Sequence, residues 1–94
     1  MLEKVIEKYL VEQVKKRGGI CEKFTSPGRR SVPDRIITMQ GGRIFFVEVK
    51  SNTGKVTEGQ SLDHAMRRRL GCEVHVVNSK EAVDAFIRSF IDSR

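Results

Sequence analysis

Long apolar runs, closely spaced cysteines and internal repeats are missing from this sequence. No stretch approaches the length of a membrane span, and residues 1–3 do not begin a secretory signal pattern. Cys21 and Cys72 have no CxxC spacing, so we expect buried reduced thiols rather than a disulfide or a zinc site. No linker or low-complexity segment divides residues 1–94. We therefore expect a single cytoplasmic domain with no membrane partner.

What the sequence does carry is a surplus of positive charge. Its 18 Lys and Arg residues outnumber its 12 Asp and Glu residues, so the net charge is +6. This balance favours a polyanionic partner such as nucleic acid. With 94 residues, of which 38% are apolar, the chain has enough material for one small core, and self-association would help to stabilise it.

Two short β-type segments, residues 35–39 and 43–47, are separated by a turn that contains Gly41 and Gly42. This pattern predicts a β-hairpin. Asp34 precedes the first segment, and Glu48 and Lys50 follow the second on a common face, because side chains alternate along a strand. Carboxylates brought close together are costly unless a cation neutralises them. Such an oxygen-rich site suits Mg²⁺ or Mn²⁺.

The length of the turn decides whether the hairpin brings its carboxylates together. With a two-residue loop, Gln40 pairs with Arg43, and Asp34 lies on the opposite face from Glu48. With a three-residue loop, Met39 pairs with Arg43, and Asp34 lies directly across from Glu48. Three-residue loops with one left-handed residue are common, and glycine supplies that residue. A shared metal site therefore requires the three-residue loop or a bulge.

The remaining segments predict a mixed α/β fold. Apolar residues four apart predict a helix over about residues 3–17, and residues 20–25 alternate as in a strand. A helix follows from Gln60, with Leu62 and Leu70 among its apolar residues, and residues 72–78 resemble a strand that is buried on both faces. Ser79 is a candidate N-cap for a last helix. This helix has a large apolar stripe, and we expect part of the stripe to face another subunit. The helical crossover favours parallel pairing of the last two strands.

Two motifs resemble the PD-(D/E)xK nuclease superfamily: Pro33-Asp34 before the hairpin and Glu48-Val49-Lys50 at its end. Within it, the chain is most similar to small stand-alone VRR-NUC (virus-type replication-repair nuclease) domains over about residues 3–86. Further matches are Gly18-Gly19, Ser26-Pro27-Gly28-Arg29-Arg30, Gln60 and Gly71. The resemblance implies a restriction-endonuclease-like core, αβββαβ plus a C-terminal helix, with a mixed sheet flanked by helices. It also implies a phage or prophage origin.

The resemblance implies a divalent-metal site on the hairpin. Asp34, Glu48 and the main-chain carbonyl of Val49 would hold Mg²⁺ or Mn²⁺, together with a glutamate of the first helix. Glu7 is favoured for this position, because family members with compact first helices place the acid about three turns before the glycine. Glu3 stays a candidate for the same role.

Lys50 and Gln60 complete the implied catalytic set. Lys50 would orient or deprotonate the attacking water, or stabilise the phosphate. Gln60 would orient water or phosphate with an amide that both donates and accepts hydrogen bonds, unless it is an exposed helix residue. His64 lies one turn further on, and we expect it on the surface or facing DNA rather than bound to metal.

Basic and polar residues near this site are candidate DNA contacts. Arg29 and Arg30 stand in a loop before the Pro-Asp motif, where guanidinium groups suit phosphates, unless the loop simply remains solvated. Ser26 is a further phosphate donor in that loop. Arg67 and Arg68 belong to a basic run on the next helix, whose members point about 100° apart, so one or two of them are expected to reach DNA.

The favoured function is that of a metal-dependent, structure-selective endonuclease that hydrolyses phosphodiester bonds in DNA. Small family members resemble Holliday-junction resolvases, so a homodimer that cuts four-way junctions is the first choice. One alternative is a nuclease on flaps, single strands or RNA. The other is a non-catalytic DNA-binding module in which the acidic pair is structural.

Overall fold

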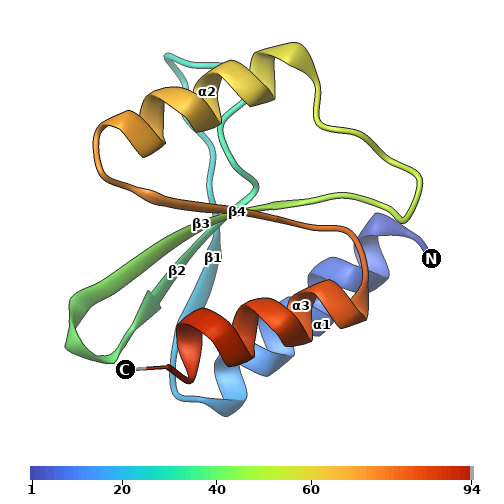
Figure 1. Ribbon diagram of the computed structural model, residues 1–94, viewed down its shortest axis with the longest axis vertical. Coiled ribbons are helices and arrows are strands. Elements are labelled where there is room, and N and C mark those ends of the chain that lie inside the picture. The colour runs from blue at the N-terminus through green and yellow to red at the C-terminus, as the bar shows by residue number, and fades with distance from the viewer. Residues whose placement is uncertain (94) are drawn as a thin grey trace.

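The computed structural model describes residues 1–93 and places them around a four-stranded mixed sheet (Figure 1). The elements are α1 (Glu3–Lys16), β1 (Ile20–Lys23), β2 (Arg35–Met39), η1 (Gln40–Gly42), β3 (Arg43–Val49), α2 (Glu58–Arg69), β4 (Glu73–Val77), α3 (Lys80–Phe86) and η2 (Ile87–Ile91). The predicted restriction-endonuclease-like order, αβββαβ plus a C-terminal helix, is confirmed. The prediction placed the start of α2 slightly late and made β1 slightly too long.

The strands lie in the order β1-β2-β3-β4. β1, β2 and β3 pair antiparallel, and β3 and β4 pair parallel, as the helical crossover predicted. β4 nevertheless forms one edge of the sheet, so the prediction that it is buried on both faces is wrong in part. Val74 and Val77 are buried, but Val76 is 40% exposed. Val76 lies on the face of the sheet that α2 covers, and α2 covers only part of that face.

The hydrophobic core lies between the sheet and two helices. α1 and α3 cover one face, and α2 lies across the other (Figure 1). α1 turns Ile6, Leu10 and Val14 inward, as their spacing predicted. Full burial of a side chain of this size contributes about 1.5–3 kcal/mol. The C-terminal stripe is largely used inside this core, and Phe90 is its one exposed large apolar side chain in the described part of the chain.

α2 turns its charged side, not its most apolar side, toward the sheet. Asp63 and His64 are buried, whereas Leu62 and Leu70 are 66% and 77% exposed. The expectation that His64 lies on the surface is therefore wrong. The physical reason is that both buried side chains find partners on other segments, His64 at Glu48 and Asp63 at two arginines.

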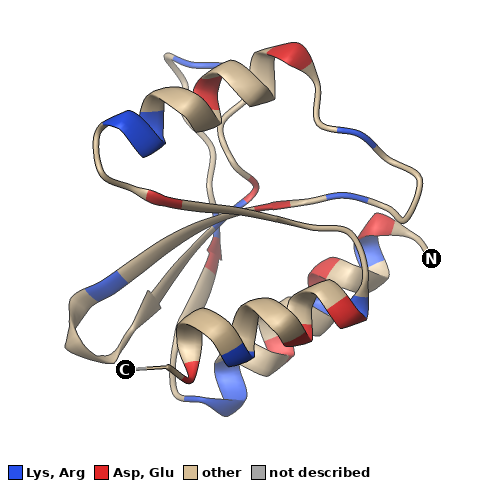
Figure 2. Ribbon diagram, viewed as in Figure 1, with Lys and Arg blue, Asp and Glu red and all other residues tan. Residues whose placement is uncertain are grey.

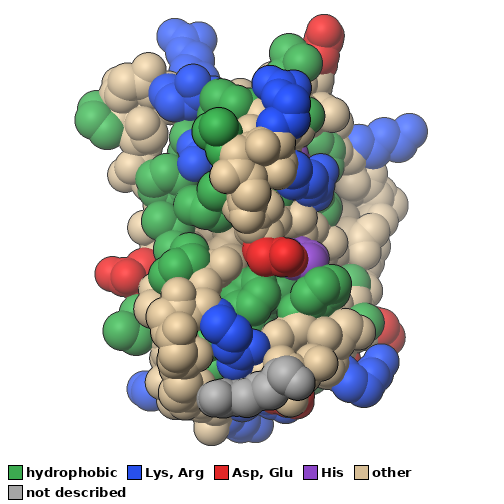
Figure 3. All heavy atoms as spheres, turned by 60° about the vertical axis from the view of Figure 1, so that its left-hand side comes forward, with side chains coloured by type: hydrophobic (Ala, Val, Ile, Leu, Met, Phe, Trp, Pro, Cys, Tyr) green, Lys and Arg blue, Asp and Glu red, His purple; other side chains and the backbone are tan. Residues whose placement is uncertain are grey.

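Two surface properties follow from this arrangement. Lys and Arg are spread over both helical layers and over the loops beside α2 (Figure 2). Hydrophobic side chains gather on the face that Figure 3 brings forward, with basic side chains among them.

No helix within residues 1–93 is long and apolar enough to cross a membrane. Cys21 and Cys72 are free, as expected, and both are only partly buried.

Candidate active site

The turn between β2 and β3 has the three-residue form. Met39 pairs with Arg43, and the residues between them form η1. Gly41 and Gly42 have φ angles of 78° and 72°, in the left-handed region that favours glycine. The sequence therefore supplies a residue type that this turn geometry requires, and of the two loop lengths considered the structure has the three-residue form that a shared site needs.

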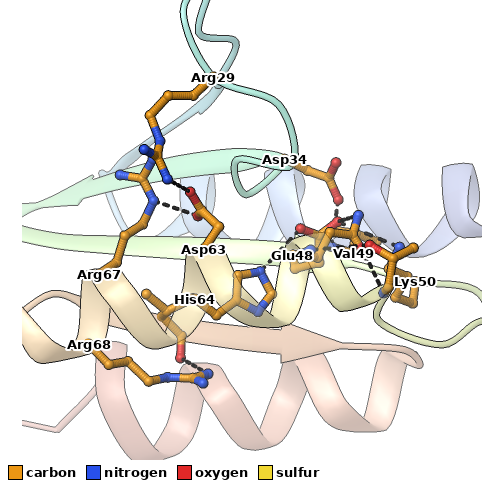
Figure 4. Close-up of polar contacts among 12 residues, drawn as sticks. Arg29, Asp34, Glu48, Val49, Lys50, Asp63, His64, Arg67 and Arg68 are labelled. Carbon is orange, nitrogen blue, oxygen red and sulfur yellow. Dashed lines mark hydrogen bonds and ion pairs between the residues drawn. The ribbon is translucent and has the colours of Figure 1, made fainter.

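This register brings the hairpin carboxylates to one end of the sheet. Arg35 pairs with Val47, so Asp34, the residue before β2, comes level with Glu48. The backbone N–H of Val49 donates to Asp34 Oδ2 at 2.8 Å. That bond orients the Asp34 carboxylate toward the strand that carries Glu48 (Figure 4).

Glu48 is almost completely buried, with 1% of its side chain exposed. Gln60 Nε2 donates to its Oε2 at 3.2 Å, and His64 Nε2 lies 3.4 Å from its Oε1. Lys50 Nζ lies 3.9 Å from Oε2. Burial, together with the hydrogen bond and the charge of Asp34, raises the pKa of Glu48 to about 8.

The pair formed by Asp34 and Glu48 fits a hard divalent cation. The raised pKa of Glu48 indicates that a second negative charge is costly at this position, and a cation removes that cost. Mg²⁺ is commonly held by one or two carboxylates, with waters and substrate phosphates as its other ligands. Within the described residues, no group of three or more His, Cys, Asp or Glu side chains is arranged to hold a metal ion. A cation here would therefore rest on two carboxylates and take its other ligands from water and phosphate.

The two candidate glutamates of α1 have different surroundings. Glu7 Oε2 accepts a bond of 2.7 Å from Arg35 Nε, so Glu7 is held in an ion pair. Glu3 is exposed in the first turn of the helix, and its charge contributes to the raised pKa of Glu48. The sequence preferred Glu7, whereas the surroundings in the structure favour Glu3 as the acid available to the site.

Gln60 links the start of α2 to the hairpin. Its backbone N–H donates to Thr57 Oγ1 at 3.1 Å, and its Oε1 accepts from the Thr57 backbone N–H at 3.0 Å. This capping box begins the helix. Because Oε1 is used there, the amide nitrogen is left to donate to Glu48. The Gln60 amide therefore accepts a hydrogen bond from the first turn of the helix and donates one to Glu48.

Comparison with known proteins establishes the family. The chain is 48% identical over 79 residues to "Putative nuclease p44" of Acyrthosiphon pisum secondary endosymbiont phage 1, which spans 84% of this chain and 85% of the relative. It also matches a solved structure described as a "VRR_NUC domain", with a TM-score of 0.88, 32% identity and coverage of 94% of this chain and 96% of the other. The chain belongs to the VRR-NUC family. No family model matches it.

Family membership confirms the resemblance that the motifs predicted, and nuclease activity follows at this coarse level. The phage relative agrees with the expected phage-type domain. In this VRR-NUC chain, the Pro-Asp and Glu-x-Lys motifs lie where the hairpin register joins them. The assignment of individual residues to catalysis stays a prediction.

The arginines predicted to contact DNA are engaged with the protein to different degrees. Arg29 and Arg67 both bind Asp63, at 3.2 and 2.7 Å. Burial by itself would raise the pKa of Asp63, but the hydrogen bonds from Arg67 and Arg29 outweigh it and lower that pKa. Arg68 donates to a main-chain carbonyl of β4 at 2.8 Å. Arg30 is exposed, and no side-chain partner for it lies within residues 1–93.

The loop before the Pro-Asp motif packs against the start of α2. The carbonyl of Ser26 accepts a hydrogen bond of 3.4 Å from the backbone of Arg29. Ser31 has a φ of 63°, an uncommon value for a residue with a side chain. A Cβ on Gly59 would lie 2.8 Å from Ser31 Oγ, so glycine allows this close approach. These contacts and the Arg29–Asp63 ion pair hold the loop against α2, the helix that carries Gln60 and His64.

Sequence reasoning missed Asp63 and His64 as site-forming residues of this VRR-NUC domain. One pattern was available. Gln60 and His64 are four residues apart, as are Asp63 and Arg67, so each pair lies on one side of a helix. The partners that bury Asp63 and His64 are distant in the sequence, so the spacing alone does not show that this side of the helix faces the sheet.

Proposed function

We propose that this protein is a metal-dependent endonuclease that hydrolyses phosphodiester bonds in DNA. The observation that carries the proposal is the acidic pair of Asp34 and Glu48. A three-residue turn brings these residues level, and the pKa of the buried member is raised to about 8. Lys50 stands beside them, 3.9 Å from Glu48. An acidic pair with one buried member next to a lysine is typical of a catalytic centre rather than of a stabilising ion pair.

The proposed roles follow from the position of each group. Asp34, Glu48 and the carbonyl of Val49 would hold Mg²⁺ or Mn²⁺, and Glu3 would supply a further acid. When bound, the cation supplies positive charge that favours ionisation of water and offsets charge on the reacting phosphate. Lys50 orients the attacking water or stabilises the phosphate oxygens.

A DNA substrate is supported by charge and by loop placement. The net charge of +6 favours a polyanion. Arg29 has one side-chain contact to Asp63 and is half exposed, and Arg30 is exposed in the same loop. Arg67 and Arg68 are largely engaged within the protein, so we assign them to positioning this surface rather than to primary phosphate contact. A domain this small has little room for base-reading elements, which favours selection by DNA shape.

A homodimer that cuts four-way junctions is the proposed working form. Ile20 and Ile44 both pair with Thr38, so they form one row across the sheet on the face of Glu48. They are 57% and 42% exposed. A second copy packed on this row would cover apolar surface that the chain leaves open. Two-fold symmetry would then present two equivalent sites to one branched substrate.

Cleavage of a labelled four-way junction tests the proposal. Linear duplex and flap DNA are run beside it, each with Mg²⁺, Mn²⁺ or EDTA. The proteins are wild type, Asp34→Ala and Asp84→Ala, a matched change at an exposed carboxylate on α3. We expect paired, symmetric, metal-dependent nicks in the junction, lost in Asp34→Ala and kept in Asp84→Ala. Binding without cutting of any substrate would instead indicate a DNA-binding module, and preferred cutting of flaps would replace the junction as substrate.

A further inference from the structure

The two carboxylate oxygens of Glu48 each face a different side chain of α2. Gln60 Nε2 lies 3.2 Å from Oε2, and His64 Nε2 lies 3.4 Å from Oε1. Because the two helix residues are four apart, their side chains project from the same side of the helix. Together they contact both oxygens of the Glu48 carboxylate.

His64 is enclosed at this position. It is 2% exposed, and Glu48 is the one hydrogen-bonding partner of its imidazole within residues 1–93. A buried imidazole needs a polar partner, and a buried carboxylate needs donors. A metal-bound carboxylate is ionised and only accepts hydrogen bonds, so in that state the nitrogen that faces it must be the donor. When a cation is bound, the pair would therefore run from His64 Nε2–H to Glu48 Oε1.

The two acids of the hairpin are oriented by different means. Asp34 has a short side chain whose Oδ2 accepts from the backbone of Val49. Glu48 has one more rotatable bond, and its carboxylate is oriented by side chains of α2. The capping box between Thr57 and Gln60 also holds the first turn of that helix. Without α2, ordering Glu48 around a cation would cost side-chain entropy at the moment of binding.

We propose that His64 is a positioning residue that, together with Gln60, holds the Glu48 carboxylate in the orientation in which it faces Asp34. This inference rests on the proposed function, in which Glu48 is a metal ligand. Partners that orient a ligating carboxylate influence metal affinity although they do not touch the metal. His64 thus acts through Glu48, and DNA binding does not depend on it directly.

Mn²⁺ titration of the protein without DNA tests this role. In His64→Phe the ring bulk remains and the donor is lost, whereas Gln in the same place puts an N–H close to the position of Nε2. We expect His64→Phe to weaken Mn²⁺ binding about 10–100-fold. His64→Gln should recover most of that loss, and junction binding in EDTA should stay at the wild-type level in both variants.

His75→Phe is the matched control, because His75 packs against the buried Phe86 and the more exposed Phe90, away from the acidic pair. It should keep wild-type Mn²⁺ affinity. If circular dichroism shows that His64→Phe does not fold, His64→Ala replaces it, with the same expected loss. The donorless variant is His64→Phe or, if that does not fold, His64→Ala. The role of His64 is overturned if the donorless variant keeps wild-type Mn²⁺ affinity. It is also overturned if His64→Gln loses as much affinity as the donorless variant.

Glu48→Gln, measured beside these variants, separates this inference from the proposed function. If it loses Mn²⁺ binding while the folded donorless His64 variant keeps it, the positioning role is wrong and the metal site stands. If Glu48→Gln binds Mn²⁺ as wild type does, or if wild type binds none, the proposed metal site is wrong and the role of His64 with it. Loss in both variants, with recovery in His64→Gln, supports both.

Discussion

At the scale of single residues, Glu48 has the most unusual environment. It is surrounded by Asp34, Lys50, Gln60 and His64, and the balance of their effects keeps its pKa far above the ordinary value. Burial and the neighbouring carboxylate outweigh the lysine. The negative charge of ionised Glu48 is unfavourable here without a cation, so the site is suited to binding a cation.

The first prediction at this scale is a pH dependence of the metal-free protein. The folded pKa of Glu48, about 8, lies above the ordinary value of 4.5, so between these values the folded state binds more protons than the unfolded state. The Glu48 contribution to the free energy of unfolding should therefore fall as pH rises from about 4.5 to about 8. Urea denaturation in EDTA across this range measures it. A Glu48→Gln variant should lose this component, and an unchanged pH profile in that variant would contradict the assignment.

A second residue-scale prediction concerns Lys50. If Lys50 orients water or stabilises phosphate, then Lys50→Ala should lower the cleavage rate about 10²–10⁴-fold, a range typical of a lost proton-transfer group. Junction affinity in EDTA should change little, because one lysine is a small part of the total charge. Single-turnover cleavage measures the rate, and Lys16→Ala, at an exposed residue of α1, is the control. A wild-type rate in Lys50→Ala would remove the lysine from the mechanism.

At the scale of elements, α2 and the loop before β2 form one unit. Asp63 binds Arg29 from the loop and Arg67 from its own helix. The guanidinium of Arg67 also lies over the rings of Phe24 and Phe46, at 5.2 and 5.0 Å. These contacts explain how a helix with a polar inner face stays on the sheet while it carries residues of the site.

Asp63→Ala tests this element-scale role. We expect a loss of about 3 kcal/mol in the free energy of unfolding, the lower end of the range for breaking a buried ion pair, because Arg29 is half exposed. Chemical denaturation measures the loss. Asp92→Ala, which breaks the more exposed pair with Arg17, should cost less than about 1 kcal/mol. Similar losses in the two variants would show that Asp63 does not anchor α2.

At the scale of the whole molecule, the open question is self-association. The described residues have an accessible surface of 5910 Å², and a standard interface covers about 800 Å² on each partner. The apolar row of the sheet is the surface best suited to contribute to such an interface. It lies on the same side of the sheet as the site, so a dimer formed there would bring two sites to one face.

Ile44→Lys tests the proposed dimer. Placing a charge in the apolar row should shift the protein from dimer to monomer in analytical ultracentrifugation and should replace paired nicks in the junction by single nicks. Val5→Lys is the matched control, because both residues are 42% exposed and Val5 lies on α1, on the opposite side of the sheet. A wild type that is monomeric at assay concentrations, or an Ile44→Lys variant that still forms the wild-type dimer, would contradict this interface.

Sequence by itself determined the order of elements and the glycine-containing turn of the hairpin, and it reduced the position of Asp34 relative to Glu48 to the length of that turn. These features depend on local periodicity, on glycines that accept a left-handed backbone, and on short spacings, all of which are written in neighbouring residues. The N-cap at Ser79 is determined in the same way.

Only the tertiary structure decided which face α2 turns to the sheet. The sequence places Leu62 and Leu70 among the apolar residues of this helix, yet both are exposed and the buried side holds Asp63 and His64. The reason is that their partners are distant in the chain: Glu48 lies 16 residues from His64, and Arg29 lies 34 residues from Asp63. A polar side chain can be buried once such a partner is in reach, and only the folded chain brings it there.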